Sequence, residues 1–167
     1  MSAAFFEDSS EAAAALIVAI TGFLLAGALV MEHVFAMDPC PLCLMQRVWF
    51  AIAGLLSLGA LIHSPRWGIY PLLTILAALA GGAFSIRQLY LQSLPEDQIP
   101  ACGPDITYML ENFPLSDVLA AMTHGTGDCA AVVWRFGLTI PGWALVGFAC
   151  IVVLAVIQLR AGIVRRT

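Results

Sequence analysis

The sequence predicts an all-α membrane protein, a bundle of four transmembrane helices with a long loop between the third and the fourth helix. Three observations favour this fold. Of the 167 residues, 61% are hydrophobic and only 11% are charged, whereas a soluble domain has about 25% charged residues. The mean hydropathy is +0.94, and lysine is absent. Four apolar stretches are each long enough to cross a bilayer core of roughly 30 Å as a helix, which takes about 20 residues.

The same composition disfavours three other classes of protein. A soluble globular protein carries more charge, and a disordered chain combines low hydrophobicity with high charge. A nucleic-acid-binding protein has a basic face, whereas this chain has a formal net charge of −4. The length suits one domain. We therefore expect residues 1–167 to form a single integral membrane domain with no nucleic-acid partner.

The apolar stretches define the expected helices in chain order. The four predicted spans are approximately residues 12–35, 41–62, 69–90 and 141–159. The first is uncharged before Glu32, and Arg47 is the only charge in the second. Pro41 falls at the start of the second span, where the missing N–H of proline breaks no helical hydrogen bond.

Residues 91–140 form the only connection that is large enough to hold chemistry in water. Two patterns of helical spacing, at residues 106–113 and 115–122, predict short helices within this loop. Apolar faces of this kind lie flat in the membrane interface or cover the end of a helix bundle. In either case we expect the loop to follow the membrane surface.

The distribution of charge predicts the orientation, because loops rich in arginine stay in the cytoplasm. The second connection and the C-terminal tail carry Arg66, Arg160, Arg165 and Arg166. The long loop carries most of the acids: Glu96, Asp97, Asp105, Glu111, Asp117 and Asp128. We therefore expect both termini in the cytoplasm and the long loop outside. Residues 1–11 lack a basic segment, so the first span is expected to remain as an anchor.

Four of the five cysteines fall on the predicted outer side, where disulfide bonds persist. Cys40 and Cys43 form a Cys-Pro-Leu-Cys motif at the start of the second span, and Cys102 and Cys129 lie in the long loop. Cys150 lies alone in the middle of the fourth span, where we expect a small core residue.

The helix start suggests what the first pair does. If Pro41 begins the helix, Cys43 lies in the first turn, where free N–H groups and the helix dipole stabilise a thiolate, the reactive form of cysteine. Arg47 follows one turn later on the same face, and a charge near the membrane boundary is usually functional. Arg47 is thus placed to stabilise the Cys43 thiolate, and also to donate hydrogen bonds to a carbonyl oxygen of a bound acceptor.

Two other interpretations of the cysteines remain open at this point. Four cysteines can form a zinc site, although the loop pair lacks Cys-x-x-Cys spacing. They can also form two inert structural disulfides, although such a bridge is hardly expected at a helix start beside a semi-buried arginine. A c-type haem is disfavoured, because Leu44 stands where the attachment motif has histidine.

Residues 39–47, in the sequence Pro-Cys-Pro-Leu-Cys-Leu-Met-Gln-Arg, and the four-span layout resemble the disulfide bond formation protein B (DsbB) family. The resemblance extends over roughly residues 12–159. It includes the Gly-Asp-Cys-Ala sequence at residues 127–130, and Trp134 followed by residues 140–143 at the entry to the last span. Cys-x-x-Cys alone is a weak motif, but its combination with the arginine, the membrane position and two loop cysteines is specific.

The resemblance implies a bacterial inner-membrane thiol oxidase. Such an enzyme reoxidises a soluble periplasmic partner of the DsbA type and passes the electrons to a membrane quinone, ubiquinone or menaquinone. By position, the partner's thiolate would attack Cys102. Cys129 would then pass electrons to Cys40. Cys43 would reduce the quinone beside Arg47, and no metal takes part.

Two competing functions come from other classes. A quinone or quinone-epoxide reductase of the vitamin K epoxide reductase type also combines a four-helix core, a Cys-x-x-Cys pair and two loop cysteines. In that family the pair follows the loop cysteines, whereas Cys40 and Cys43 precede them here. A disulfide-stabilised membrane scaffold is the non-enzymatic alternative, and it would neither consume quinone nor form a thiolate–quinone absorption band.

Three other polar residues lie near the predicted outer boundary. We expect His33 to cap the first helix, with proton relay to a reduced quinone as the alternative. Gln46 and Arg87 are most simply interfacial residues that extend toward the polar surface, and each is also a candidate to face a quinone headgroup.

Overall fold

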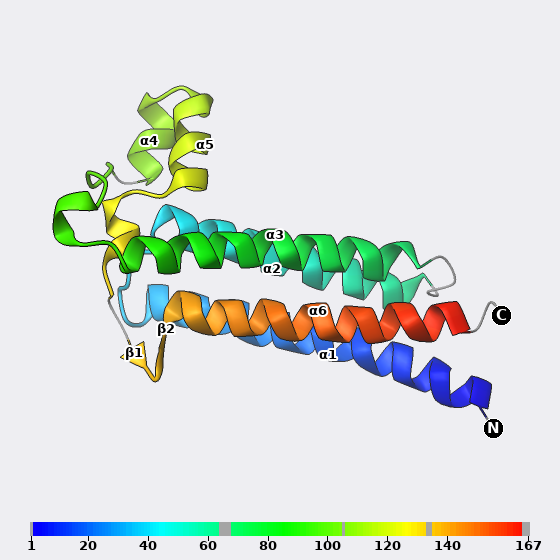
Figure 1. Cartoon of the computed structure of the whole chain (residues 1–167). Coiled ribbons are helices and arrows are strands. Elements are labelled where there is room, and N and C mark those ends of the chain that lie inside the picture. The colour runs from blue at the N-terminus through cyan, green and yellow to red at the C-terminus, as the bar shows by residue number, and fades with distance from the viewer. Residues whose placement is uncertain (1, 64–67, 105, 133–134, 165–167) are drawn as a thin grey trace.

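The structure, a computed structural model, describes residues 2–63, 68–104, 106–132 and 135–164. Four long helices lie side by side as a bundle, and α1 begins at the same end of the bundle at which α6 ends (Figure 1). The helices are α1 (Ser2–His33), α2 (Pro41–Ile62), α3 (Ile69–Gln92) and α6 (Ile140–Val164). Each contains a stretch that is long and apolar enough to cross a membrane. The predicted fold class is therefore confirmed.

The helix boundaries agree closely with the predicted spans. The part of α1 that is apolar enough to cross a membrane, Ser9–His33, starts a little earlier than predicted and ends before Phe35. The chain then turns through Ala36, whose φ of 50° is incompatible with a continuing right-handed helix. α2 starts at Pro41 and ends at Ile62, as the sequence predicts.

Each long helix packs against two neighbours, in the order α1, α2, α3, α6 and back to α1. Across the centre of the bundle, Phe50 of α2 stacks on Phe148 of α6 with ring centroids 3.8 Å apart. Gly81 of α3 makes room for this stack, because a Cβ at that position would overlap the Phe148 ring. Small residues allow such close approach of helices in lipid, where packing rather than hydrophobicity drives association.

The long loop folds into short elements at the end of the bundle where α1 ends and α2 begins, hereafter the loop end (Figure 1). In chain order these elements are η1 (Glu96–Gln98), α4 (Ile106–Asn112), α5 (Leu115–His124), η2 (Gly127–Ala130), β1 (Arg135–Phe136) and β2 (Leu138–Thr139). α4 and α5 confirm the two predicted helical patterns. Their exposed apolar residues, such as Leu110 and Leu119, suit a membrane surface, and contact with that surface stays a prediction.

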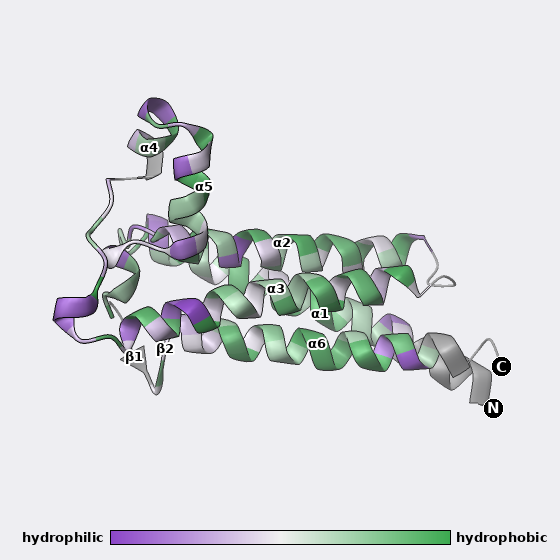
Figure 2. Cartoon of the chain, turned by 45° about the horizontal axis from the view of Figure 1, so that its top comes forward, coloured by the Kyte–Doolittle hydropathy of each residue, from purple (hydrophilic) through white to green (hydrophobic). Residues whose placement is uncertain are grey.

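Hydropathy separates the bundle from its loop end. Figure 2 shows predominantly hydrophobic residues along the four long helices, and hydrophilic residues gathered at the loop end and on α4. Apolar side chains also cover the outside of the bundle: Phe23 is 78% exposed and Val153 is 59% exposed. Such an exterior is suited to lipid, which is as apolar as these side chains. The protein is therefore a multi-pass membrane protein.

Candidate active site

Three cysteine sulfurs meet at the loop end. Cys40 precedes α2, Cys43 lies in its first turn, and Cys129 lies on η2. The Sγ atoms of Cys40 and Cys43 are 2.9 Å apart, and the side chains of Cys40 and Cys129 are hydrogen-bonded to each other. All five cysteines are free thiols in this structure. Folding of the loop therefore brings a cysteine that is distant in sequence onto the Cys-x-x-Cys pair.

The start of α2 positions the pair. Cys40 is the N-cap residue, with an extended backbone (φ −67°, ψ 161°), and Pro41 is the first helical residue. The Cys40 sulfur accepts a hydrogen bond from the backbone N–H of Cys43 at 3.4 Å. The sulfur thus takes the place of an oxygen cap at a helix N-terminus, where unsatisfied N–H groups favour negative charge.

The Cys129 sulfur is buried and electron-rich. Its side chain is 0% exposed and packs with Leu42 and Leu91. The hydrogen bond from Cys40, supported by backbone hydrogen bonds from Leu42 and Thr126, lowers the pKa of Cys129 to about 6. The same contact between the two thiols raises the pKa of Cys40. This contact therefore favours the thiolate on Cys129 and the thiol on Cys40.

Cys102 is exposed to solvent, in contrast to the buried Cys129. Its thiol is hydrogen-bonded to the Asp128 carboxylate, whose negative charge raises the pKa of Cys102. The backbone N–H of Gly127 donates to the carbonyl oxygen of Ala101 at 3.2 Å, and a Cβ on Gly127 would lie 3.2 Å from the Cys102 sulfur. The two loop cysteines therefore lie on adjoining segments, with Cys102 facing solvent and Cys129 facing the bundle.

Two glutamines complete the surroundings of the Cys-x-x-Cys pair. Gln88 of α3 is 3% exposed, and its Nε2 lies 3.2 Å from the Cys43 sulfur and 3.4 Å from the Cys40 sulfur. Its Oε1 accepts a hydrogen bond from Gln46 Nε2 at 2.8 Å. Gln46 is only 4% exposed, so the prediction that it extends toward the polar surface is wrong, because its amide bonds to Gln88 inside the bundle.

Sequence reasoning missed Gln88, although a pattern pointed to it. The buried face of α3 repeats at three- and four-residue spacing through Ala78, Gly81 and Ser85 to Gln88. A glutamine that continues a line of small residues in a membrane span is expected to face the bundle interior, where it needs a hydrogen-bonding partner.

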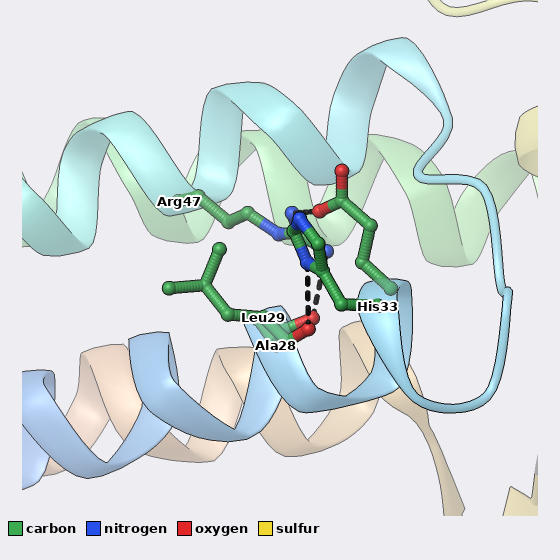
Figure 3. Close-up of polar contacts among 5 residues, drawn as sticks. Ala28, Leu29, His33 and Arg47 are labelled. Atoms are coloured by element: carbon green, nitrogen blue, oxygen red, sulfur yellow. Dashed lines mark hydrogen bonds and ion pairs between the residues drawn. The ribbon is translucent and has the colours of Figure 1, made fainter.

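Arg47 contacts α1. Its guanidinium forms an ion pair with Glu32 and donates a hydrogen bond to the carbonyl oxygen of Ala28 at 3.1 Å, and Figure 3 shows the side chain reaching toward that helix. The side chains of Arg47 and Glu32 remain 21% and 31% exposed. Among the hydrogen bonds of the described residues, none joins Arg47 to Cys43. The role of Arg47 toward a bound acceptor stays a prediction.

Two other predicted boundary residues make local contacts. His33 Nδ1 donates to the carbonyl oxygen of Leu29 at 3.0 Å (Figure 3), as expected of a residue that caps the end of α1. Arg87 Nε donates to the carbonyl oxygen of His124 at 3.2 Å, and its guanidinium lies 5.6 Å from the centroid of the Tyr90 ring. Arg87 therefore joins α3 to the end of α5.

Cys150 is exposed on α6 and lines an apolar pocket together with Phe23 and Trp143. The prediction of a core position is wrong, because α6 is apolar on its outer face as well as its inner face and periodicity does not distinguish the two. Trp134, one of the residues that carried the family resemblance, lies outside the described residues.

Comparison with known proteins gives one consistent family. The sequence profile described as "Disulfide bond formation protein DsbB" matches residues 10–158. "Disulfide bond formation protein B" of Marinobacter nauticus is 55% identical over 83% of this chain and 85% of its own length. The protein of the same name from Hahella chejuensis is 50% identical over 78% of this chain and 81% of its own length. "Disulfide bond formation protein B 1" of Pseudomonas aeruginosa is 42% identical over 81% of this chain and 85% of its own length. No solved structure matches the chain at a significant level.

Proposed function

This chain belongs to the disulfide bond formation protein B (DsbB) family, and from that premise we propose that it reoxidises a soluble DsbA-type dithiol protein and passes the electrons to a membrane quinone. The quinone is ubiquinone or menaquinone. The protein lies in the bacterial inner membrane with both termini in the cytoplasm and the loop end at the periplasmic face. The excess of arginine in the sequence of the second connection and the C-terminal tail, and of acids in that of the long loop, supports this orientation.

The contact between Cys129 and Cys40 carries the proposal. It joins the loop to the pair at the membrane, so that electrons can pass between them by attack of a thiolate on a disulfide. With Cys40 and Cys43 joined as a disulfide, the Cys129 thiolate attacks the Cys40 sulfur. A Cys129–Cys40 bond forms, the Cys40–Cys43 bond breaks, and the electron pair of the broken bond leaves on Cys43. The Cys102 thiolate, released from the partner, then attacks the Cys129 sulfur, which re-forms the Cys102–Cys129 disulfide and releases Cys40.

Cys102 supplies the contact with the soluble partner. With Cys102 and Cys129 joined as a disulfide, one partner thiolate attacks the exposed Cys102 sulfur and forms a mixed disulfide. Cys129 then leaves as a thiolate, which its pKa of about 6 makes favourable. The second partner thiol attacks the partner's own sulfur in the mixed disulfide, which oxidises the partner and releases Cys102.

The helix that carries Cys43 also carries a group that suits a quinone. A bound quinone accepts two electrons and two protons. The Arg47 guanidinium has five N–H donors, and its described hydrogen bonds reach only Glu32 and Ala28. The remaining donors are available to a carbonyl oxygen, and a partly exposed cation near the membrane boundary stabilises negative charge that develops there.

Coupled turnover tests the proposal. A purified DsbA-type protein in its dithiol form is mixed with ubiquinone or menaquinone and catalytic amounts of this protein, and quinone loss and thiol loss are followed together. One quinone should be consumed for each partner disulfide formed. Cys150→Ala is the matched control and should turn over like the parent, because Cys150 lies outside the site. Quinone reduction without partner oxidation would favour a reductase, and no quinone consumption would favour a scaffold.

A further inference from the structure

We infer that Gln88, oriented by Gln46, is a further catalytic residue, whose side-chain amide holds the Cys43 sulfur as a thiolate ready to give up electrons. The two glutamines reach the pair from α3 and α2, and both are almost fully buried. Most buried side-chain amides are hydrogen-bonded. In this protein the partners of the Gln88 amide nitrogen are the two sulfurs that would undergo the redox reaction.

The distances allow one amide group to bond to both sulfurs. Gln88 Nε2 lies 3.2 Å from the Cys43 sulfur and 3.4 Å from the Cys40 sulfur. A carboxamide nitrogen carries two hydrogens, so each sulfur can accept one of them. Cys43 is the nearer acceptor, and a hydrogen bond to an ionised acceptor is stronger than a bond to a neutral one.

Gln46 determines which side of the Gln88 amide faces the sulfurs. Its Nε2 donates to Gln88 Oε1 at 2.8 Å. The Cys43 thiol also lies within reach of that oxygen, at 3.6 Å, but the Gln88 nitrogen is nearer to the sulfur, at 3.2 Å. The bond from Gln46 therefore fixes the amide with its nitrogen as the group closer to the cysteines. An amide in the opposite orientation would present its oxygen to the sulfurs, and this oxygen would repel a thiolate. Gln46 is therefore a positioning residue that acts through Gln88.

The other polar groups nearby are used elsewhere. The described hydrogen bonds of Arg47 reach Glu32 and Ala28 on α1. The backbone N–H of Cys43 is directed to the Cys40 sulfur. The Cys40 thiol, on the same segment of chain, also lies 2.9 Å from the Cys43 sulfur, and it is the group with which Cys43 forms the disulfide. Among the hydrogen bonds of the described residues, the donor that reaches the Cys43 sulfur from a neighbouring helix is the Gln88 amide. A thiolate in this half-buried place needs such a donor, because desolvation disfavours its charge.

The oxidation step defines what the amide does. Cys40 and Cys43 start as thiols, one S–S bond forms between them, and two electrons and two protons pass to the acceptor. Cys43 must lose its proton before its electrons can leave, and the Gln88 N–H stabilises the sulfur in that state. This inference rests on the proposed function for the identity of the acceptor, but not for the effect of Gln88 on the sulfur.

Alkylation of a single cysteine tests the inference without quinone or partner. The parent for this test is the full chain with its other cysteines replaced, namely Cys40→Ser, Cys102→Ser, Cys129→Ser and Cys150→Ala. The probe is iodoacetamide, a small uncharged reagent that reacts with the thiolate, and intact mass gives the rate at a fixed neutral pH. Gln88→Leu should slow alkylation of Cys43 about tenfold, as expected for the loss of a hydrogen bond to a charged group. Gln46→Leu should slow it less, because the Gln88 amide remains but can turn.

Two further variants separate an effect on the reactivity of Cys43 from an effect on folding. Gln92→Leu, one turn further along α3, is the matched control, because its buried Oε1 has no hydrogen-bonding partner among the described residues. It should react at the parent rate. The double variant Gln46→Leu with Gln88→Leu removes both amides and leaves neither without a partner, a change that is often nearly neutral for stability. It should fold, as judged by circular dichroism and gel filtration in detergent, and should react as slowly as Gln88→Leu.

The outcomes distinguish this inference from the proposed function. A folded double variant that reacts at the parent rate overturns the role of Gln88, even if the unmodified protein consumes quinone. Slow alkylation in the variants supports that role, even if the unmodified protein consumes none and the proposed function fails. If neither leucine variant folds, Gln88→Asn withdraws the amide while keeping the site polar, and a parent rate in this variant overturns the inference.

Discussion

Replacing each member of the Arg47–Glu32 ion pair in turn separates a role in chemistry from a role in anchoring α2 to α1. Arg47→Gln and Glu32→Gln both break the pair. If the pair only anchors the helices, the two variants should behave alike. If Arg47 binds the quinone oxygen, the two variants should change the quinone KM in opposite directions. Arg47→Gln removes the charge that binds the quinone, whereas Glu32→Gln removes the carboxylate that competes for that charge.

The expected magnitudes follow from the geometry. The two side chains are 21% and 31% exposed, and ion pairs this open to solvent add little to folding stability, so both variants should fold. A hydrogen bond from Arg47 to a charged oxygen is worth about 1.5–3 kcal/mol, which is on the order of tenfold to a hundredfold in affinity. Arg47→Gln should therefore raise the quinone KM about tenfold or more, whereas Glu32→Gln should lower it.

Steady-state turnover against quinone concentration is the assay, with the DsbA-type dithiol protein held in excess. Arg47→Lys should fall between the parent and Arg47→Gln, because lysine keeps the charge and loses the planar fork. Exchange between the loop cysteines and the partner should continue in all variants, since that step does not involve quinone. An equal rise in KM for Arg47→Gln and Glu32→Gln, or an unchanged quinone dependence in folded Arg47→Gln, would refute the reasoning.

Three other predictions concern single cysteines. Cys102→Ser should abolish the mixed disulfide with a partner that carries only its attacking cysteine, while Cys40 and Cys43 still exchange electrons with quinone; peptide mapping that finds the partner on Cys40 would contradict the assignment. Because the pKa of Cys129 is lowered to about 6, its alkylation should persist as the pH falls toward that value. Cys40→Ala removes the main donor and should move this dependence toward the ordinary thiol pKa of about 8.5, and an unmoved profile would show that Cys40 is not the cause. Cys150→Ala should keep turnover near that of the parent, and a loss of activity in a folded variant would place Cys150 in the mechanism.

Most of the fold was predictable because helices in a membrane are determined locally. Each span must satisfy its own backbone hydrogen bonds, so its length and hydropathy largely set its limits. Pro41 marked the start of α2, where its fixed φ and missing N–H suit the first helical turn. The apolar spacing in the loop predicted α4 and α5 for the same reason, since a pattern within a few residues sets an amphipathic face.

The candidate site was predictable only in part. The sequence by itself determined the four spans, the long loop at one end and the cysteines Cys40 and Cys43 at a helix start, because these depend on neighbours in the chain. Only the tertiary structure decided that Gln88 bonds to their sulfurs and that Arg47 faces Glu32. Both pairings depend on the rotation of one helix against another. That rotation is set by packing over whole helix faces, where long apolar spans are alike on every side and give no local sign of which face turns inward.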